Sequence, residues 1–251
     1  MKLILLAIFA LSTHAFTLVG SSIATYSNPE IPVYIGDSSC SNLDTTPEEL
    51  RDLSIKAMEK FWNKVSTSEL RLDVQGLKNI DSSFYTDKIC STGTGCIPAV
   101  PNGVYIICND NTTTFTSTGI LAVTLPNNVT GSTIVGGVVA INAIASTKFN
   151  GLSENEKISV IAHEVGHAFG LGHSKIEDSL MYASSKSGRT RLGRDDWDGA
   201  TFLYPKEQGP AGLCGTIKDV SEQNTQGPFI LGLFALLFLL IGHKAFILKN
   251  R

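Results

Sequence analysis

The sequence predicts an α+β domain in which a small sheet carries two main helices. Short apolar runs with strand character alternate with segments of helical period, and no internal repeat is present. The chain has 251 residues, of which 43% are hydrophobic, so it is long enough for one domain with a real core and short appendages. Its formal net charge of −3 gives no reason to expect a nucleic acid as a partner.

The first half of this domain is expected to supply most of the strands. Residues 31–35 read as a short strand, and Thr46 as N-cap with Pro47 after it begins a helix whose apolar period continues to about Val65. Further strands are predicted at 70–74, 104–108, 120–125 and 135–141. The stretch PNNVTGST between the last two has the composition of a turn.

The second half carries the other main helix and a last, shorter one. Ser153 and Glu156 form a capping-box pattern, and the helix that follows runs into residues 163–173. A final helix is expected over about 194–204, where Pro205 ends it.

Both ends of the chain differ in composition from its middle. Residues 1–15 have the basic, apolar and small-residue order of a secretory signal peptide, so the main domain is expected at 16–205. The polar stretch 206–227 reads as a linker. Residues 228–248 are apolar enough for a transmembrane helix, or for a sorting segment cut off after export, and 249–251 form a basic tail. We therefore expect an exported protein, anchored in a membrane with its main domain outside.

The five cysteines are compatible with export, because disulfides persist in oxidising compartments. Cys90 and Cys96 flank a short loop and could close it, and Cys40 and Cys108 are the next candidates for a pair. Cys214 is then left over, and spacing alone does not settle the connectivity.

The stretch HEVGHAFGLGH, residues 163–173, predicts a metal site. On a helix, His163 and His167 lie one turn apart on the same face, so both imidazoles reach one ion. Gly170, where we expect a positive φ, lets the chain turn out of the helix and bring His173 back as a third ligand. Three protein ligands leave a fourth position open, which is the plan of a catalytic zinc site.

Glu164 adds a carboxylate to the same open side. A zinc ion would acidify a water molecule and polarise a carbonyl, and Glu164 would take the water proton and pass it to the leaving amine. A solvated helix face explains HExxH alone, but it does not explain Gly170 and His173 as well. The other two histidines, His14 and His243, fall in the expected signal peptide and in the apolar segment 228–248, so the main domain uses histidine nowhere else.

The longer motif resembles the signature of the metzincin metallopeptidases. Residues 179–182 (SLMY) are similar to their Met-turn, in which Met181 would lie beneath the metal. Within that clan the chain resembles the matrixins, the matrix-metalloproteinase-like family, through this turn and through residues 192–204. The resemblance covers about residues 31–205. It implies a zincin-like catalytic domain with a small twisted, mostly parallel sheet, an active-site helix and a C-terminal helix.

The resemblance also implies a function and substrate contacts. Residues 16–205 would be the catalytic domain of a zinc metalloendopeptidase that holds one catalytic zinc and cleaves a protein or peptide. Leu121 and Ala122 would lie on an exposed edge strand that pairs with an extended substrate. Tyr182 would help to wall the pocket for the side chain after the scissile bond. We expect a monomer.

Two departures from the family pattern concern other metals. Matrixins carry a structural zinc whose histidines sit in the strand region, and Val123 and Ala140 stand where such ligands would be. We therefore expect no structural zinc. The family's calcium sites are in doubt here, because segment 131–142 contains no acidic residue that could bind calcium.

Two other functions compete with the endopeptidase. One is a metzincin-like domain that binds metal or protein without cutting, against which Glu164 argues, since a binding module has no use for a general base. The second is a zinc amidase that acts on cell-wall peptides. An edge-strand cleft favours an extended peptide but does not exclude this activity.

Overall fold

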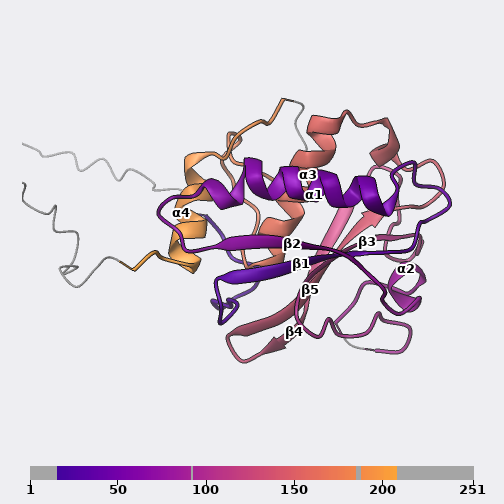
Figure 1. The fold of residues 1–251 in the computed structure, drawn as a ribbon, viewed down its shortest axis with the longest axis horizontal. Coiled ribbons are helices and arrows are strands. Elements are labelled where there is room, and N and C mark those ends of the chain that lie inside the picture. The colour runs from indigo at the N-terminus through magenta and orange to yellow at the C-terminus, as the bar shows by residue number, and fades with distance from the viewer. Residues whose placement is uncertain (1–15, 92, 185–187, 208–251) are drawn as a thin grey trace, which may run out of the picture. The chain divides into compact units, whose positions relative to one another are not determined.

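The computed structural model of the chain describes residues 16–91, 93–184 and 188–207 (Figure 1). They confirm the α+β class, with a five-stranded sheet in the order β2-β1-β3-β5-β4. The strands are β1 (Glu30–Gly36), β2 (Arg71–Lys78), β3 (Gly103–Asn109), β4 (Ala122–Thr130) and β5 (Thr133–Asn142). Neighbouring strands are parallel except for the antiparallel pair β4–β5, so the sheet is mostly parallel, as the resemblance implies.

The two predicted main helices are present and cover one face of the sheet (Figure 1). The α-helices are α1 (Pro47–Lys60), α2 (Ser83–Thr86), α3 (Glu154–Ala168) and α4 (Arg194–Leu203), and the 3₁₀ helices are η1 (Trp62–Lys64) and η2 (Lys148–Gly151). Helix α1 contacts β1 and β2, whereas α3 contacts β4 and β5. The single-turn helix α2 was not predicted, because four residues are too few to show a helical period.

Capping boxes begin both long helices, whereas the sequence predicts the full motif only for α3 and an N-cap at Thr46 for α1. Thr46 Oγ1 accepts the N–H of Glu49 at 3.2 Å, and the Glu49 carboxylate accepts the N–H of Thr46 at 2.9 Å. Ser153 and Glu156 form the same motif at α3. The α-helical expectation to Val65 is wrong in its last turn, where the chain tightens into η1. There the buried indole of Trp62 donates a hydrogen bond of 2.7 Å to the Ala162 carbonyl of α3 and ties the two helices together.

Strand β3 shows how the sheet is buried on both faces, because every one of its residues is buried. Val104 and Ile106 belong to the cluster that packs under the helices. Tyr105 and Ile107 point to the opposite face and join a second cluster with Phe84 of α2. The sheet therefore forms a rigid platform below α3.

The turn predicted over PNNVTGST is wrong for most of its length, because β4 continues to Thr130 and only residues 131–132 separate it from β5. Pro126 lies where the β4–β5 register is irregular, in an edge strand that tolerates a missing N–H. The side chains of Asn127 and Asn128 donate to carbonyls of segment 98–100, each at 2.8 Å. These contacts keep a turn-like sequence extended.

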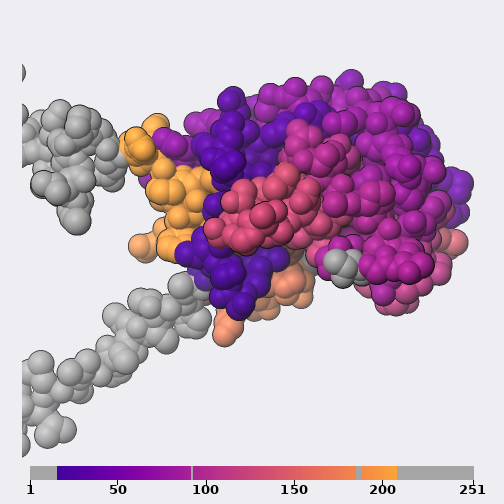
Figure 2. All heavy atoms as spheres, turned by 90° about the horizontal axis from the view of Figure 1, so that it is seen from below, coloured from indigo at the N-terminus to yellow at the C-terminus, as the bar shows by residue number. Residues whose placement is uncertain are grey.

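The N-terminal segment, residues 16–26, joins distant parts of the domain and was not predicted. In Figure 2 these residues, in indigo, lie between the orange helix α4 and the pink β4–β5 hairpin. Thr25 exchanges backbone hydrogen bonds with the hairpin, and the rings of Phe16 and Phe202 lie 5.1 Å apart. The segment thus binds the end of the sheet to the last helix.

Two disulfides close loops in the domain. Cys40 pairs with Cys108 and Cys90 pairs with Cys96, which confirms both candidate pairs. Cys214 lies outside the described residues.

The segments predicted at the chain ends also fall outside the described residues. These are the signal peptide at 1–15, the linker at 206–227 beyond its first two residues, the apolar segment at 228–248 and the tail at 249–251. In the part of the chain that is described, no helix is both long and apolar enough to cross a bilayer.

Candidate metal centre

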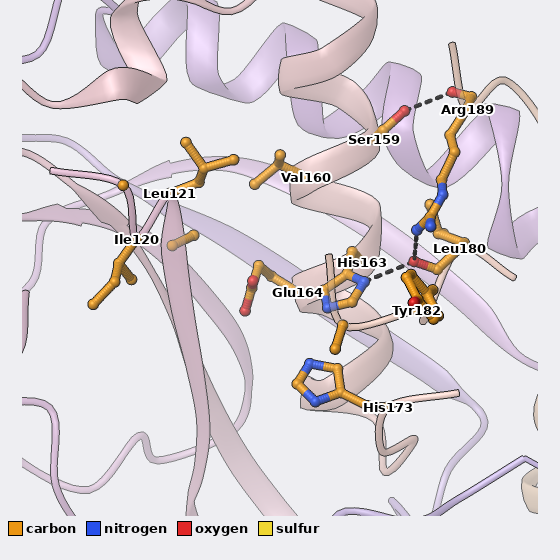
Figure 3. A pocket seen from close by; sticks show the side chains of 13 residues that line it. Ile120, Leu121, Ser159, Val160, His163, Glu164, His173, Leu180, Tyr182 and Arg189 are labelled. Atoms are coloured by element: carbon orange, nitrogen blue, oxygen red, sulfur yellow. Dashed lines mark hydrogen bonds between the residues drawn. The ribbon is translucent and has the colours of Figure 1, made fainter. Parts of the chain in front are cut away.

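Helix α3 and the turn after it bring the three motif histidines together. His163 and His167 project from the same face of α3, one turn apart, and His173 follows from the chain beyond the helix. One ring nitrogen from each lies within 4.8 Å of the others. Figure 3 shows the His173 ring below the His163 ring and the Glu164 side chain.

Gly170 makes the turn that returns His173. Its φ is +122°, which confirms the expected positive value and which side chains with a Cβ rarely adopt. A Cβ there would also lie 2.8 Å from the carbonyl oxygen of Ala24 in the N-terminal segment. That segment holds the returning chain, because Thr17 accepts the N–H of Gly172 at 2.7 Å and its hydroxyl donates to the His173 carbonyl at 2.6 Å.

The backbone fixes which nitrogen of two histidines is free. His163 Nδ1 lies 2.7 Å from the Leu180 carbonyl, and His167 Nδ1 lies 2.6 Å from the Leu171 carbonyl. A carbonyl oxygen only accepts, so both Nδ1 atoms carry the hydrogen and donate. In neutral rings both Nε2 atoms then keep a lone pair, the arrangement that orients metal-binding histidines.

The two free nitrogens fit a tetrahedral zinc ion. His163 Nε2 and His167 Nε2 lie 3.2 Å apart. An ion that binds both at the usual zinc–nitrogen length of about 2.0–2.1 Å holds them about 3.3 Å apart. Burial lowers the pKa of His163 to about 3 and that of His167 to about 4, so both rings are neutral at pH 7. Two facing lone pairs repel each other, and a cation between them removes that repulsion.

Glu164 lies beside this cluster and has a partner that the sequence did not reveal. The hydroxyl of Thr124, on β4, is 2.7 Å from Glu164 Oε2 and 3.1 Å from the Glu164 carbonyl oxygen. Burial raises the pKa of Glu164 to about 7, and the hydrogen bond from Thr124 acts in the opposite direction. A carboxyl group with a pKa near neutrality is suited to both accepting and releasing a proton.

The turn at residues 179–182 lies directly behind the cluster. Met181 is 2% exposed, and a Cβ on Gly166 of α3 would collide with its sulfur, so the glycine permits the close approach. The buried carboxylate of Asp196, on α4, organises this turn. It accepts hydrogen bonds from the hydroxyl of Ser179 and the N–H groups of Leu180, Met181 and Gly193 at 2.5–3.1 Å.

A cavity of about 290 Å³ opens next to the histidines. Leu121 and Ala122 form one wall at the start of β4, which is an edge strand paired only with β5. Tyr182 and Arg189 line the other side, and His163 and Glu164 lie between, as Figure 3 shows. The structure thus brings the predicted metal-binding, acid–base and substrate-contacting residues to one cleft.

Four contributors were missed by sequence reasoning: Thr124, Asp196, Thr17 and Arg189. Each acts on a motif residue from a different element, so no local spacing points to it. Only Asp196 carried a signal, since it lies in the stretch 192–204 that resembles the matrixin C-terminal helix.

Comparison with known proteins gives one family match and several partial matches to individual proteins. Residues 102–205 match the family described as Matrixin. Metalloendoproteinase 2-MMP of Arabidopsis thaliana is 36% identical over 73 residues, 28% of this chain and 19% of that protein. Interstitial collagenase of Bos taurus is 46% identical over 57 residues, 22% and 12% of the two chains. Karilysin of Tannerella forsythia is 37% identical over 62 residues, 23% and 13%. The match thus spans less than a fifth of each of these relatives.

Proposed function

Residues 102–205 make this chain a member of the matrixin family, and from that membership we propose that it is an exported zinc-dependent endopeptidase. The convergence of two Nε2 lone pairs 3.2 Å apart, beside His173 and Glu164, carries the proposal. His163, His167 and His173 would hold the zinc. When bound, zinc supplies Lewis acidity, which polarises a peptide carbonyl and makes a water molecule more acidic.

Glu164 is the proposed general base and acid. Thr124 occupies its Oε2, which leaves Oε1 to take a proton from the attacking water. The water oxygen bonds to the carbonyl carbon, the carbon–nitrogen bond breaks, and the proton passes from Glu164 to the leaving amine. The pKa of about 7 lets the carboxyl do both at neutral pH.

The open edge of β4 supports an extended peptide as the substrate. Leu121 and Ala122 would offer backbone groups to it, as in strand addition. Tyr182 would wall the cavity for the side chain that follows the cleaved bond. Gly170 and Met181 support the site through the backbone turn and the packing behind α3.

We propose a single zinc per chain. Val123 and Ala140 are direct partners across the β4–β5 ladder, and neither side chain offers a ligand atom where a structural zinc would need one. Both disulfides agree with export. We further propose that 1–15 is removed, that 16–205 is a monomeric catalytic domain, and that 228–248 anchors it to a membrane through the linker 206–227. Full-length protein should then resist extraction by carbonate.

Metal removal tests the function. Purified protein should contain one zinc, cleave an unfolded protein, lose activity with a chelator and regain it with one equivalent of zinc. Zinc binding without cleavage would favour a binding domain, and cleavage of cell-wall peptides alone would favour the amidase.

A further inference from the structure

Among the described residues that line the cavity beside the histidines, Arg189 is a cation that the proposed mechanism does not use. The cavity walls are largely apolar, formed by Ile120, Leu121, Val160 and Leu180. Arg189 brings a guanidinium to the side opposite Leu121, as Figure 3 shows. Burial lowers the pKa of Arg189 from its ordinary value, but a guanidinium remains charged at neutral pH.

Neutral acceptors hold this guanidinium in place. Arg189 Nη1 donates to the Leu180 carbonyl at 2.9 Å, and Nη2 donates to the Glu177 carbonyl at 3.3 Å. The guanidinium carbon also lies 5.6 Å from the centre of the Tyr182 ring. The Ser159 hydroxyl fixes the Arg189 backbone through a 2.7 Å bond to its carbonyl. The cation is therefore part of the cavity wall rather than a freely moving surface charge.

No described residue neutralises this charge by a direct ion pair. The nearby Asp178 binds Arg191 at 3.0 and 3.1 Å, and Asp196 is saturated by the turn at 179–182. Of the five guanidinium N–H groups, two donate to the described residues, and the enclosed Nε finds no acceptor among them. The guanidinium is partly buried, and Asp196 and Asp178 act on it only at a distance. An anion that enters the cavity would therefore gain a direct charge-assisted partner.

We propose that Arg189 is a specificity-determining residue, which makes the cavity select a substrate side chain that ends in a carboxylate. This inference rests on the proposed peptidase function. The apolar walls pack the methylene stem of a glutamate, and the guanidinium forms charge-assisted hydrogen bonds with its carboxylate. A glutamine of the same shape fills the cavity but lacks the charge.

Matched peptides test this selectivity. Mass spectrometry of products first locates the cleaved bond, because the residue that follows it is the one whose side chain is proposed to enter the cavity. Peptides that differ only there, with glutamate or glutamine, are then compared by kcat/KM. We expect wild type to prefer glutamate roughly tenfold, the scale of a hydrogen bond to a charged group. Arg189→Gln should bring the ratio close to one.

The control is Arg191→Gln, which removes the same charge at a position two residues along the chain. The Arg191 side chain is exposed and paired with Asp178. It should keep the glutamate preference. If Arg189 served only to hold the Leu180 and Glu177 carbonyls, Arg189→Gln would slow both peptides equally. A variant that fails to fold is replaced by Arg189→Met, which keeps an apolar stem against Tyr182.

A wild-type ratio of kcat/KM, glutamate peptide over glutamine peptide, of one or less overturns the proposal. A ratio that is unchanged in Arg189→Gln, or that falls equally in Arg191→Gln, also overturns it. Binding separates this failure from failure of the peptidase function. In Glu164→Gln, a labelled glutamate peptide should bind roughly tenfold more tightly than its glutamine counterpart, whether or not any peptide is cut. Binding without cleavage by wild type would contradict the peptidase function alone.

Discussion

At the scale of single residues, the site depends on partners that hold each functional side chain. Carbonyl oxygens orient His163 and His167 so that both Nε2 atoms face one point, and Thr124 holds one oxygen of Glu164. Glu164 is thereby placed at the cluster without having to bind the ion. The proposed reaction therefore depends on how these partners orient the side chains as well as on which residues the motif contains.

Thr124→Val tests the contact between β4 and the proposed base. The hydroxyl of Thr124 stabilises the carboxylate and so lowers the Glu164 pKa, whereas burial raises it. Without the hydroxyl the pKa of Glu164 rises. Because Glu164 must be ionised to act as a base, its active form is then populated only at higher pH. The acid limb of kcat/KM should therefore move to higher pH, and the rate at pH 6 should fall roughly tenfold. Thr124→Ser, which keeps the hydroxyl, is the control; an unchanged pH profile in the valine variant would show that Thr124 does not act on Glu164.

The motif predicted the histidine cluster, the positive φ of Gly170 and the position of Glu164, because all three follow from helix geometry over eleven residues. Thr124 and Arg189 could not be predicted in this way. Thr124 reaches Glu164 from 40 positions away, and Arg189 reaches the Leu180 carbonyl from nine positions away, outside any helix or strand repeat. Their roles depend on tertiary packing, which periodicity does not encode.

At the scale of elements, α4 controls the turn that backs the metal centre. The Asp196 carboxylate receives four hydrogen bonds from residues 179–181 and 193 and is 1% exposed. The same turn presents the Leu180 carbonyl to His163. Helix α4 is therefore coupled to the orientation of His163, a proposed metal ligand.

Asp196→Asn should destabilise this arrangement, because an amide NH₂ would replace one acceptor and face a backbone N–H. We expect a loss of about 2–4 kcal/mol in the free energy of unfolding and weaker zinc binding. Chemical denaturation and zinc titration measure the two effects. Asp198→Asn, an exposed position on the same helix, should change stability by less than about 0.5 kcal/mol. Equal effects of the two substitutions would contradict the role of Asp196.

Long elements were predictable because caps and apolar periods are local. Helix α1 begins at the predicted N-cap Thr46, and α3 begins at the predicted capping box of Ser153 and Glu156. Strand β4 was predicted too short, since Asn127 and Asn128 have turn propensity but bind the backbone of segment 98–100. The N-terminal segment escaped prediction because its partners, the β4–β5 hairpin and α4, lie far along the chain.

At the scale of the whole molecule, burial of the histidines couples folding to pH. The pKa values of His163 and His167 are about 3 and 4 in the folded chain, against an ordinary value of 6.5. As pH falls below 6.5, the unfolded chain binds protons that the folded chain refuses, so the folded state loses stability until the pH reaches the folded pKa values.

Metal-free protein should therefore lose stability steadily between pH 6.5 and about 4, which urea denaturation with a chelator measures. The variant with both His163→Gln and His167→Gln should show a shallower decline, because it lacks the two groups. Zinc should stabilise wild type at pH 7 and protect less as pH falls, since protons compete for the ligands. An identical pH dependence in wild type and the double variant would contradict this account.

The central claim is that Glu164 acts as the base beside zinc held by three histidines. Its most direct test is the kcat of Glu164→Gln for a peptide substrate, measured at the same zinc content as wild type. The account predicts one zinc per chain in both proteins and a kcat reduced about a hundredfold or more in the variant, the usual scale for a positioned general base. Full zinc content with undiminished cleavage would contradict it.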